Sequence, residues 1–146
     1  EVEKMLKDWD LSCYDELVFC GYGEPMERLD DLLEIAGYIK KNTNLTVRIN
    51  TNGLSDLING KETAPRLEGL IDAVSVSLNQ SDAEKYNDLC HPEFGMDAYP
   101  AMLKFTEDVK KYVPRVAMSV VGVIPTSDIE KCRKITEKLE VPFRVR

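Results

Sequence analysis

The sequence lacks the features that would place it in a nucleic-acid-binding or membrane class. It has no basic excess, since 19 Lys and Arg stand against 26 Asp and Glu, for a net charge of −7. Nucleic-acid affinity rests largely on basic side chains that release counterions, so we expect no direct binding to nucleic acid. The longest apolar stretch, near residues 116–124, is far shorter than the roughly 20 residues of a membrane span. We therefore expect a cytoplasmic protein with no membrane partner.

Metal-binding side chains are also sparse. His91 is the only histidine, and the four cysteines, Cys13, Cys20, Cys90 and Cys132, lie far apart in the chain. They have neither the spacing of a metal site nor the density of a secreted disulfide scaffold, which favours free thiols and no metal site within this chain. The adjacent pair Cys90–His91 has no partners nearby, so we interpret it as part of a structural or substrate-side loop.

The pattern along the chain alternates between strand and helix. The length of 146 residues suits one domain, residues 1–146. After a helical opening, strands are predicted at 16–20, 45–50, 73–78, 116–123 and 143–146, with helices at about 29–39, 64–70, 81–89, 98–112 and 127–139. Two capping-box patterns, Ser81 with Glu84 and Ser127 with Glu130, predict helix starts, and the fourth strand is apolar enough for burial on both faces. This alternation predicts an α/β fold with a parallel five-stranded sheet and outer helices.

The predicted strands end in small, amide or hydroxyl residues, at 21–25, 50–53, 77–80 and 122–126. In parallel α/β folds the ligand lies beyond the carboxyl ends of the strands. These residues therefore favour hydrogen bonding to a polar small molecule. A Gly-x-Gly pattern taken alone favours an ordinary strand-to-helix turn over a ligand site.

Three of these strand ends carry a resemblance. Residues 21–25, Gly-Tyr-Gly-Glu-Pro, resemble the Gly-Gly-Glu-Pro loop of radical S-adenosylmethionine enzymes. Residues 51–53 match the Thr-Asn-Gly that often ends the next strand, and residues 77–79 fall where that superfamily places ribose-contacting polar residues. Together with residues 89–92 and 143–146, the chain is most similar to the radical enzymes associated with TatD-type nucleases.

This resemblance implies a partial TIM-type (β/α)6 barrel that binds a 4Fe–4S cluster and S-adenosylmethionine. Such an enzyme takes an electron from a donor such as flavodoxin or ferredoxin and makes a 5′-deoxyadenosyl radical, which removes a hydrogen atom from a substrate, here unknown. The family's C-x3-C-x2-C cluster motif does not occur in this chain, and the resemblance implies that it precedes Glu1 in a longer protein. For the 146 residues alone we expect an inactive fragment with no cluster and weak S-adenosylmethionine binding, and self-association through exposed strand edges.

The resemblance also implies roles for individual residues. The carbonyls of Tyr22, Gly23 and Glu24 would accept hydrogen bonds from the methionine ammonium, and Pro25 ends this loop. Ser77 and Asn79 would contact the ribose hydroxyls, Asn52 would face the cleft, and Val123 or Ile124 would give apolar contact to the adenine. The alternative interpretations are an ordinary turn for the loop at 22–25, a polar strand exit for Ser77 and Asn79, and a core strand end for Val123 or Ile124. No catalytic residue is assigned.

A different class of function also fits the length and strand number. A non-enzymatic receiver or flavodoxin-like module has a similar α/β composition. Receivers need an acidic cluster and a phospho-accepting aspartate at strand ends, and those positions here carry Gly, Asn and Ser.

Overall fold

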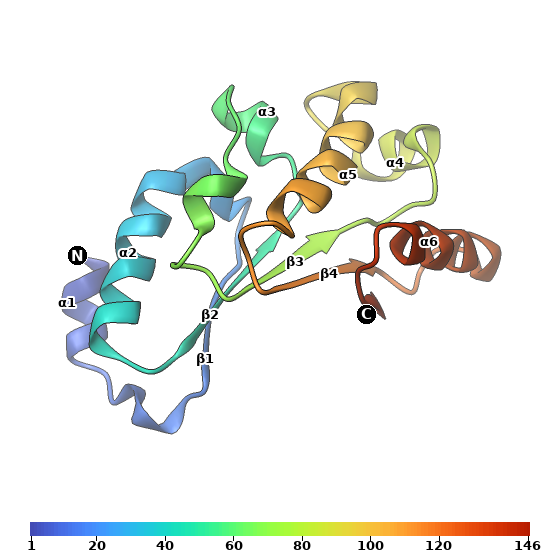
Figure 1. Cartoon of the computed structure of the whole chain (residues 1–146). Coiled ribbons are helices and arrows are strands. Elements are labelled where there is room, and N and C mark those ends of the chain that lie inside the picture. Colours follow the sequence, from blue (N-terminus) through green and yellow to red (C-terminus); the bar gives the residue numbers. More distant parts are fainter.

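Five parallel strands form one sheet in the order in which they occur along the chain (Figure 1). The computed structural model describes residues 1–146. The strands are β1 (Glu16–Phe19), β2 (Thr46–Thr51), β3 (Ala73–Ser77), β4 (Arg115–Val120) and β5 (Phe143–Val145). Every neighbouring pair is parallel, from β1 beside β2 to β4 beside β5. The predicted α/β class and the parallel five-stranded sheet are therefore confirmed.

Helices occupy the connections between these strands. They are α1 (Val2–Lys7), α2 (Leu29–Asn42), α3 (Ser55–Asn59), α4 (Ala83–Cys90), α5 (Ala98–Val109) and α6 (Thr126–Lys138), with short 3₁₀ helices η1 (Leu11–Cys13), η2 (Pro25–Arg28), η3 (Ala64–Leu67) and η4 (Gly95–Asp97). Because each crossover connects adjacent parallel strands in the same direction, a right-handed connection brings every helix to the same side. In agreement, α2, α5 and α6 contact β2, β3 and β4 respectively (Figure 1). None of the six α-helices combines the length and the apolar character that a membrane span requires.

One face of the sheet is apolar and the other is polar. Val47, Ile49, Val76 and Met118 are fully buried in the core that the helices cover. Successive side chains of a strand point to opposite faces, so the residues between them, such as Arg48 and Ser75, lie on the other face and are only half-buried. The sheet thus has a helix-covered face and an open polar face.

The fourth strand is shorter than predicted, although its carboxyl half, Met118 to Val120, is buried on both faces. β4 ends at Val120 instead of continuing to residue 123, and Val121 and Val123 are 38% and 80% exposed. A parallel strand needs continuous apolar residues only where both faces are covered. Here the apolar run continues past the strand into an exposed loop.

Both predicted capping boxes are wrong. α4 begins after Asp82, whose carboxylate accepts the Lys85 N–H at 2.9 Å. α6 begins at Thr126 after Pro125, with no side-chain cap. Asp128, in the first turn of α6, instead accepts a 2.6 Å hydrogen bond from the Lys85 ammonium. This ion pair joins the starts of the two helices.

Candidate site at the carboxyl ends of the strands

The predicted site residues lie along a single edge of the sheet. The strands are parallel, so the loops after β1, β2, β3 and β4 all leave from their carboxyl ends. Hydrogen bonds join two of these loops to the end of the neighbouring strand. The Leu78 and Asn79 N–H groups donate to the Ser119 carbonyl at 2.8 and 3.3 Å, and the loop after β1 is tied to the end of β2 through Glu24.

The glycine loop after β1 has an open main chain. Gly23 has a φ of +111°, in the region that favours glycine, yet a Cβ added there would meet no atom within 4 Å. Glycine is therefore required by conformation and not by lack of space. Tyr22 is fully exposed and its side chain points away from the protein. A ligand can thus approach the backbone of this loop without displacing a side chain.

The Glu24 carboxylate holds this loop against β2. Its Oε1 accepts hydrogen bonds from the Thr51 hydroxyl at 2.7 Å and from the Met26 N–H at 3.1 Å, and its Oε2 accepts from the Asn52 N–H at 2.7 Å. The predicted role of Glu24 used its carbonyl, and the side chain proves to have a separate, structural role. Pro25 follows as the first residue of η2.

Burial raises the pKa of the Glu24 carboxyl above its usual value. The three hydrogen bonds lower the pKa but do not fully offset the burial, and the nearby Glu27 charge adds to the rise. A buried carboxylate with three donors is stable only while those donors stay in place. Glu24 therefore couples the positions of two predicted site loops.

The end of β2 is a tightly packed turn. The Asn52 side chain accepts the Leu54 N–H at 2.9 Å, so its oxygen is used within the turn. Gly53 has a φ of +77°, and a Cβ there would lie 2.8 Å from Met102 Cγ and 2.9 Å from Val76 Cγ1. The Asn-Gly pair thus makes a turn, and α5 packs directly on it.

Two buried polar atoms without partners lie at the ends of β3 and β4. Asn79 has a φ of +61°, its Nδ2 donates to Cys90 Sγ at 3.7 Å, and its Oδ1 is buried with no partner. Ser119 Oγ is likewise buried and unpaired. Ser77 accepts a 3.3 Å hydrogen bond from the Arg146 guanidinium. Ser119 was not predicted, although a serine within an apolar strand was a usable signal.

The loop after β4 presents only one of its two predicted apolar residues. Val123 is 80% exposed, whereas Ile124 is 7% exposed and belongs to the hydrophobic core. The Ile124 side chain packs against the protein, so apolar contact with a ligand at this loop comes from Val123.

The Cys90–His91 pair lies at the end of α4. Burial raises the pKa of the Cys90 thiol, with the Asn79 hydrogen bond acting in the opposite direction, so the thiol is not activated as a nucleophile. His91 adopts the left-handed conformation, with a φ of +45°, and caps the helix. The chain contains no group of three or more His, Cys, Asp or Glu residues arranged to hold a metal ion.

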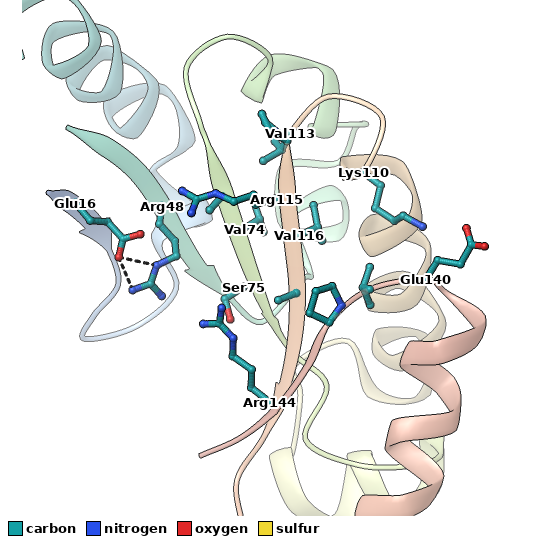
Figure 2. A pocket seen from close by; sticks show the side chains of 15 residues that line it. Glu16, Arg48, Val74, Ser75, Lys110, Val113, Arg115, Val116, Glu140 and Arg144 are labelled. Carbon is teal, nitrogen blue, oxygen red and sulfur yellow. Dashed lines mark hydrogen bonds and ion pairs between the residues drawn. The ribbon is translucent and has the colours of Figure 1, made fainter. Parts of the chain in front are cut away.

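A concave region lies on the open polar face of the sheet. Figure 2 shows this cavity, of about 450 Å³, with Arg48, Arg115 and Arg144 among the residues that line it. Glu16 also lines it and pairs with Arg48 at 2.8 Å. No role was predicted for these residues from the sequence. The available signal was a basic residue on the same face of three different strands.

A scan of protein-family models finds no match to the chain, and a search of curated proteins finds none either.

Proposed function

We propose that this chain is the barrel portion of a radical S-adenosylmethionine enzyme, closest to the TatD-associated group, and that the carboxyl edge of its sheet is the S-adenosylmethionine site. The observation that carries the proposal is the common edge shared by the Gly21–Pro25, Asn52–Gly53 and Ser77–Asn79 motifs. The open glycine loop and the unpaired Asn79 Oδ1 fit a polar ligand there.

The topology supports a partial (β/α)6 barrel. Its strands follow in sequence order, all are parallel, and the helices cover one face while the other is polar. A flavodoxin-like module instead orders its strands 2-1-3-4-5, with helices on both faces. The observed order β1-β2-β3-β4-β5 therefore favours the barrel over the receiver or flavodoxin-like alternative.

The residues of the edge divide the binding work by chemistry. The carbonyls of Tyr22, Gly23 and Glu24 accept hydrogen bonds from the ammonium of the methionine part. An ammonium group has only donors, so it requires such acceptors. Glu24 holds that loop in place through its bonds to Thr51 and to the Asn52 N–H. Ser77 and Asn79 offer a hydroxyl and an amide oxygen to the ribose.

The apolar contact to the adenine comes from Val123, the exposed member of the last loop. When bound, a 4Fe–4S cluster and S-adenosylmethionine supply a 5′-deoxyadenosyl radical for hydrogen abstraction. The ligands of the cluster are cysteines that we place outside this chain. The cluster receives its electron from a donor such as flavodoxin or ferredoxin.

A nuclear magnetic resonance titration of the ¹⁵N-labelled chain with S-adenosylmethionine tests the binding site. We expect weak, saturable shifts confined to the four loops at the carboxyl edge. Asn79→Gly removes the unpaired oxygen while suiting the positive φ, and it should weaken binding. Asn44→Ala, an exposed asparagine before β2, is the matched control and should bind as the parent chain does.

Shifts scattered over the surface, or shifts that Asn79→Gly leaves unchanged, would contradict the assignment of this edge. The gene gives an independent test of the enzyme class. A C-x3-C-x2-C motif encoded within a few dozen codons before Glu1 is expected, and an open reading frame there without it would refute the radical chemistry.

A further inference from the structure

The cavity on the open polar face brings together arginines from three strands. In the register of the sheet, Arg48 on β2 and Arg115 on β4 both align with Ala73 on β3. Arg144 on β5 aligns with Ser119 on β4. Figure 2 shows the three side chains extending over the same face, Arg144 toward Ser75. Small residues, Ala73, Ser75 and Ala117, line the cavity between them and leave its centre free of bulky side chains.

These arginines share one nearby carboxylate. Arg48 donates to Glu16 Oε1 from Nε at 3.0 Å and from Nη2 at 2.8 Å, and its Nη1 donates to Asn50 at 2.7 Å. Arg115 and Arg144 form no side-chain hydrogen bond or ion pair, yet both lie close enough for their charges to help lower the pKa of Glu16. Asp72, the other carboxylate near Arg115, is already bonded to Lys40 at 2.7 Å.

The charge balance of this cavity is opposite to that of the protein. The whole chain carries −7, whereas three guanidinium groups here face the single Glu16 carboxylate. Lys110 and Glu140, of opposite charge, line the cavity on the other side of β4 (Figure 2). Two guanidinium groups with free N–H donors therefore remain uncompensated on a concave surface. Guanidinium groups match the geometry of carboxylate and phosphate oxygens, which they bind in pairs.

We propose that this cavity is a binding site for a small anion with two or more negative charges, a phosphate ester or a di- or tricarboxylate, held by Arg48, Arg115 and Arg144. A dianion would balance the two uncompensated positive charges. The volume of about 450 Å³ suits a metabolite-sized ligand. Arg48 and Arg115 lie toward the amino ends of their part of the sheet, whereas Arg144 extends back from the level of Ser119. The proposal does not depend on the assignment of the carboxyl edge.

Isothermal titration calorimetry of the 146-residue chain with inorganic phosphate and with citrate, at low ionic strength, tests the proposal. We expect saturable binding of at least one probe, and the tighter probe identifies the source of the oxyanion. Arg115→Gln and Arg144→Gln should each raise the Kd by roughly tenfold or more, because each removes a charge-assisted contact. Glu16→Gln should lower the Kd severalfold by freeing Arg48.

Arg66→Gln is the matched control. Arg66 is an exposed arginine of η3 in an ion pair with Asp30, away from the cavity, and its loss should leave the Kd within about twofold. Circular dichroism of each variant confirms that the fold is kept. Absence of saturable binding by either probe would overturn the proposal. So would binding that Arg66→Gln weakens as much as Arg115→Gln does, since that indicates only a response to net charge.

Discussion

Replacement of Glu24 by glutamine tests whether this side chain holds the glycine loop to β2. Glutamine has nearly the same shape and keeps one oxygen, which can still accept from Met26 N–H and the Thr51 hydroxyl. Its amide nitrogen would then face the Asn52 N–H, so a donor meets a donor where the carboxylate accepts at 2.7 Å. The substitution therefore removes one charge-assisted hydrogen bond and leaves a half-buried N–H without a partner.

The expected cost follows from these contacts. A hydrogen bond to a charged group contributes about 1.5–3 kcal/mol. The neutral side chain avoids the cost of burying a charge, which offsets part of the loss. We expect Glu24→Gln to lower the free energy of unfolding by about 1–2.5 kcal/mol. The neighbouring Glu27→Gln, at an exposed position, should change it by no more than about 0.5 kcal/mol.

Urea unfolding followed by circular dichroism measures these differences, and amide hydrogen exchange reports the site itself. The Asn52 amide should lose protection in Glu24→Gln but not in Glu27→Gln. The pH dependence has a defined sign. Because the pKa of Glu24 is raised in the folded state, that state binds the proton more tightly, and ionisation costs stability as the pH rises. The advantage of the parent chain over Glu24→Gln should therefore widen as the pH falls from 7 toward 4.

Two results would refute this reasoning. One is a Glu24→Gln variant as stable as Glu27→Gln with unchanged exchange at Asn52. The other is a stability difference between the parent chain and Glu24→Gln that becomes smaller as the pH falls. That result would mean that hydrogen bonding affects the pKa of the Glu24 carboxyl more than burial does.

Two further substitutions test the packing of the turn after β2 and the ion pair between Lys40 and Asp72. Gly53→Ala places a Cβ 2.8 Å from Met102 Cγ at a φ of +77°, so we expect a loss of about 2–4 kcal/mol in urea unfolding. Gly60→Ala, at a φ of +64° with nothing within 4 Å, should lose only about 1–2 kcal/mol, and equal losses would show that crowding plays no part. Asp72→Asn should lose about 1–2 kcal/mol at pH 7, because its carboxylate binds Lys40 and the Val47 N–H. Burial raises the pKa of Asp72, but those hydrogen bonds lower it further, to below the ordinary value. The difference in free energy of unfolding between the parent chain and Asp72→Asn should be complete above about pH 4 and should shrink below it. A difference that stays constant down to about pH 2 would contradict this role.

Much of the fold could be predicted from the sequence because its signals are local. Alternating strand and helix patterns, separated by Gly, Asn and Pro, predicted five parallel strands, and the strand-end motifs at residues 21–25, 51–53 and 77–79 do lie along one edge. The predicted helix caps were wrong because Asp82, the residue after Ser81, caps α4 and because α6 begins at Thr126, and β4 ends before its apolar run does. Lys85 pairs with Asp128 across two helix starts, and no local pattern encodes that contact.

The sequence by itself determined the class of fold and the composition of the strand-end loops, since periodicity and glycine placement act within a few residues. Only the tertiary structure decided that Glu24 joins two loops and that Arg48, Arg115 and Arg144 lie over one cavity. These two facts depend on side chains separated by tens of residues, which approach one another only because parallel strands align their ends and alternate their faces.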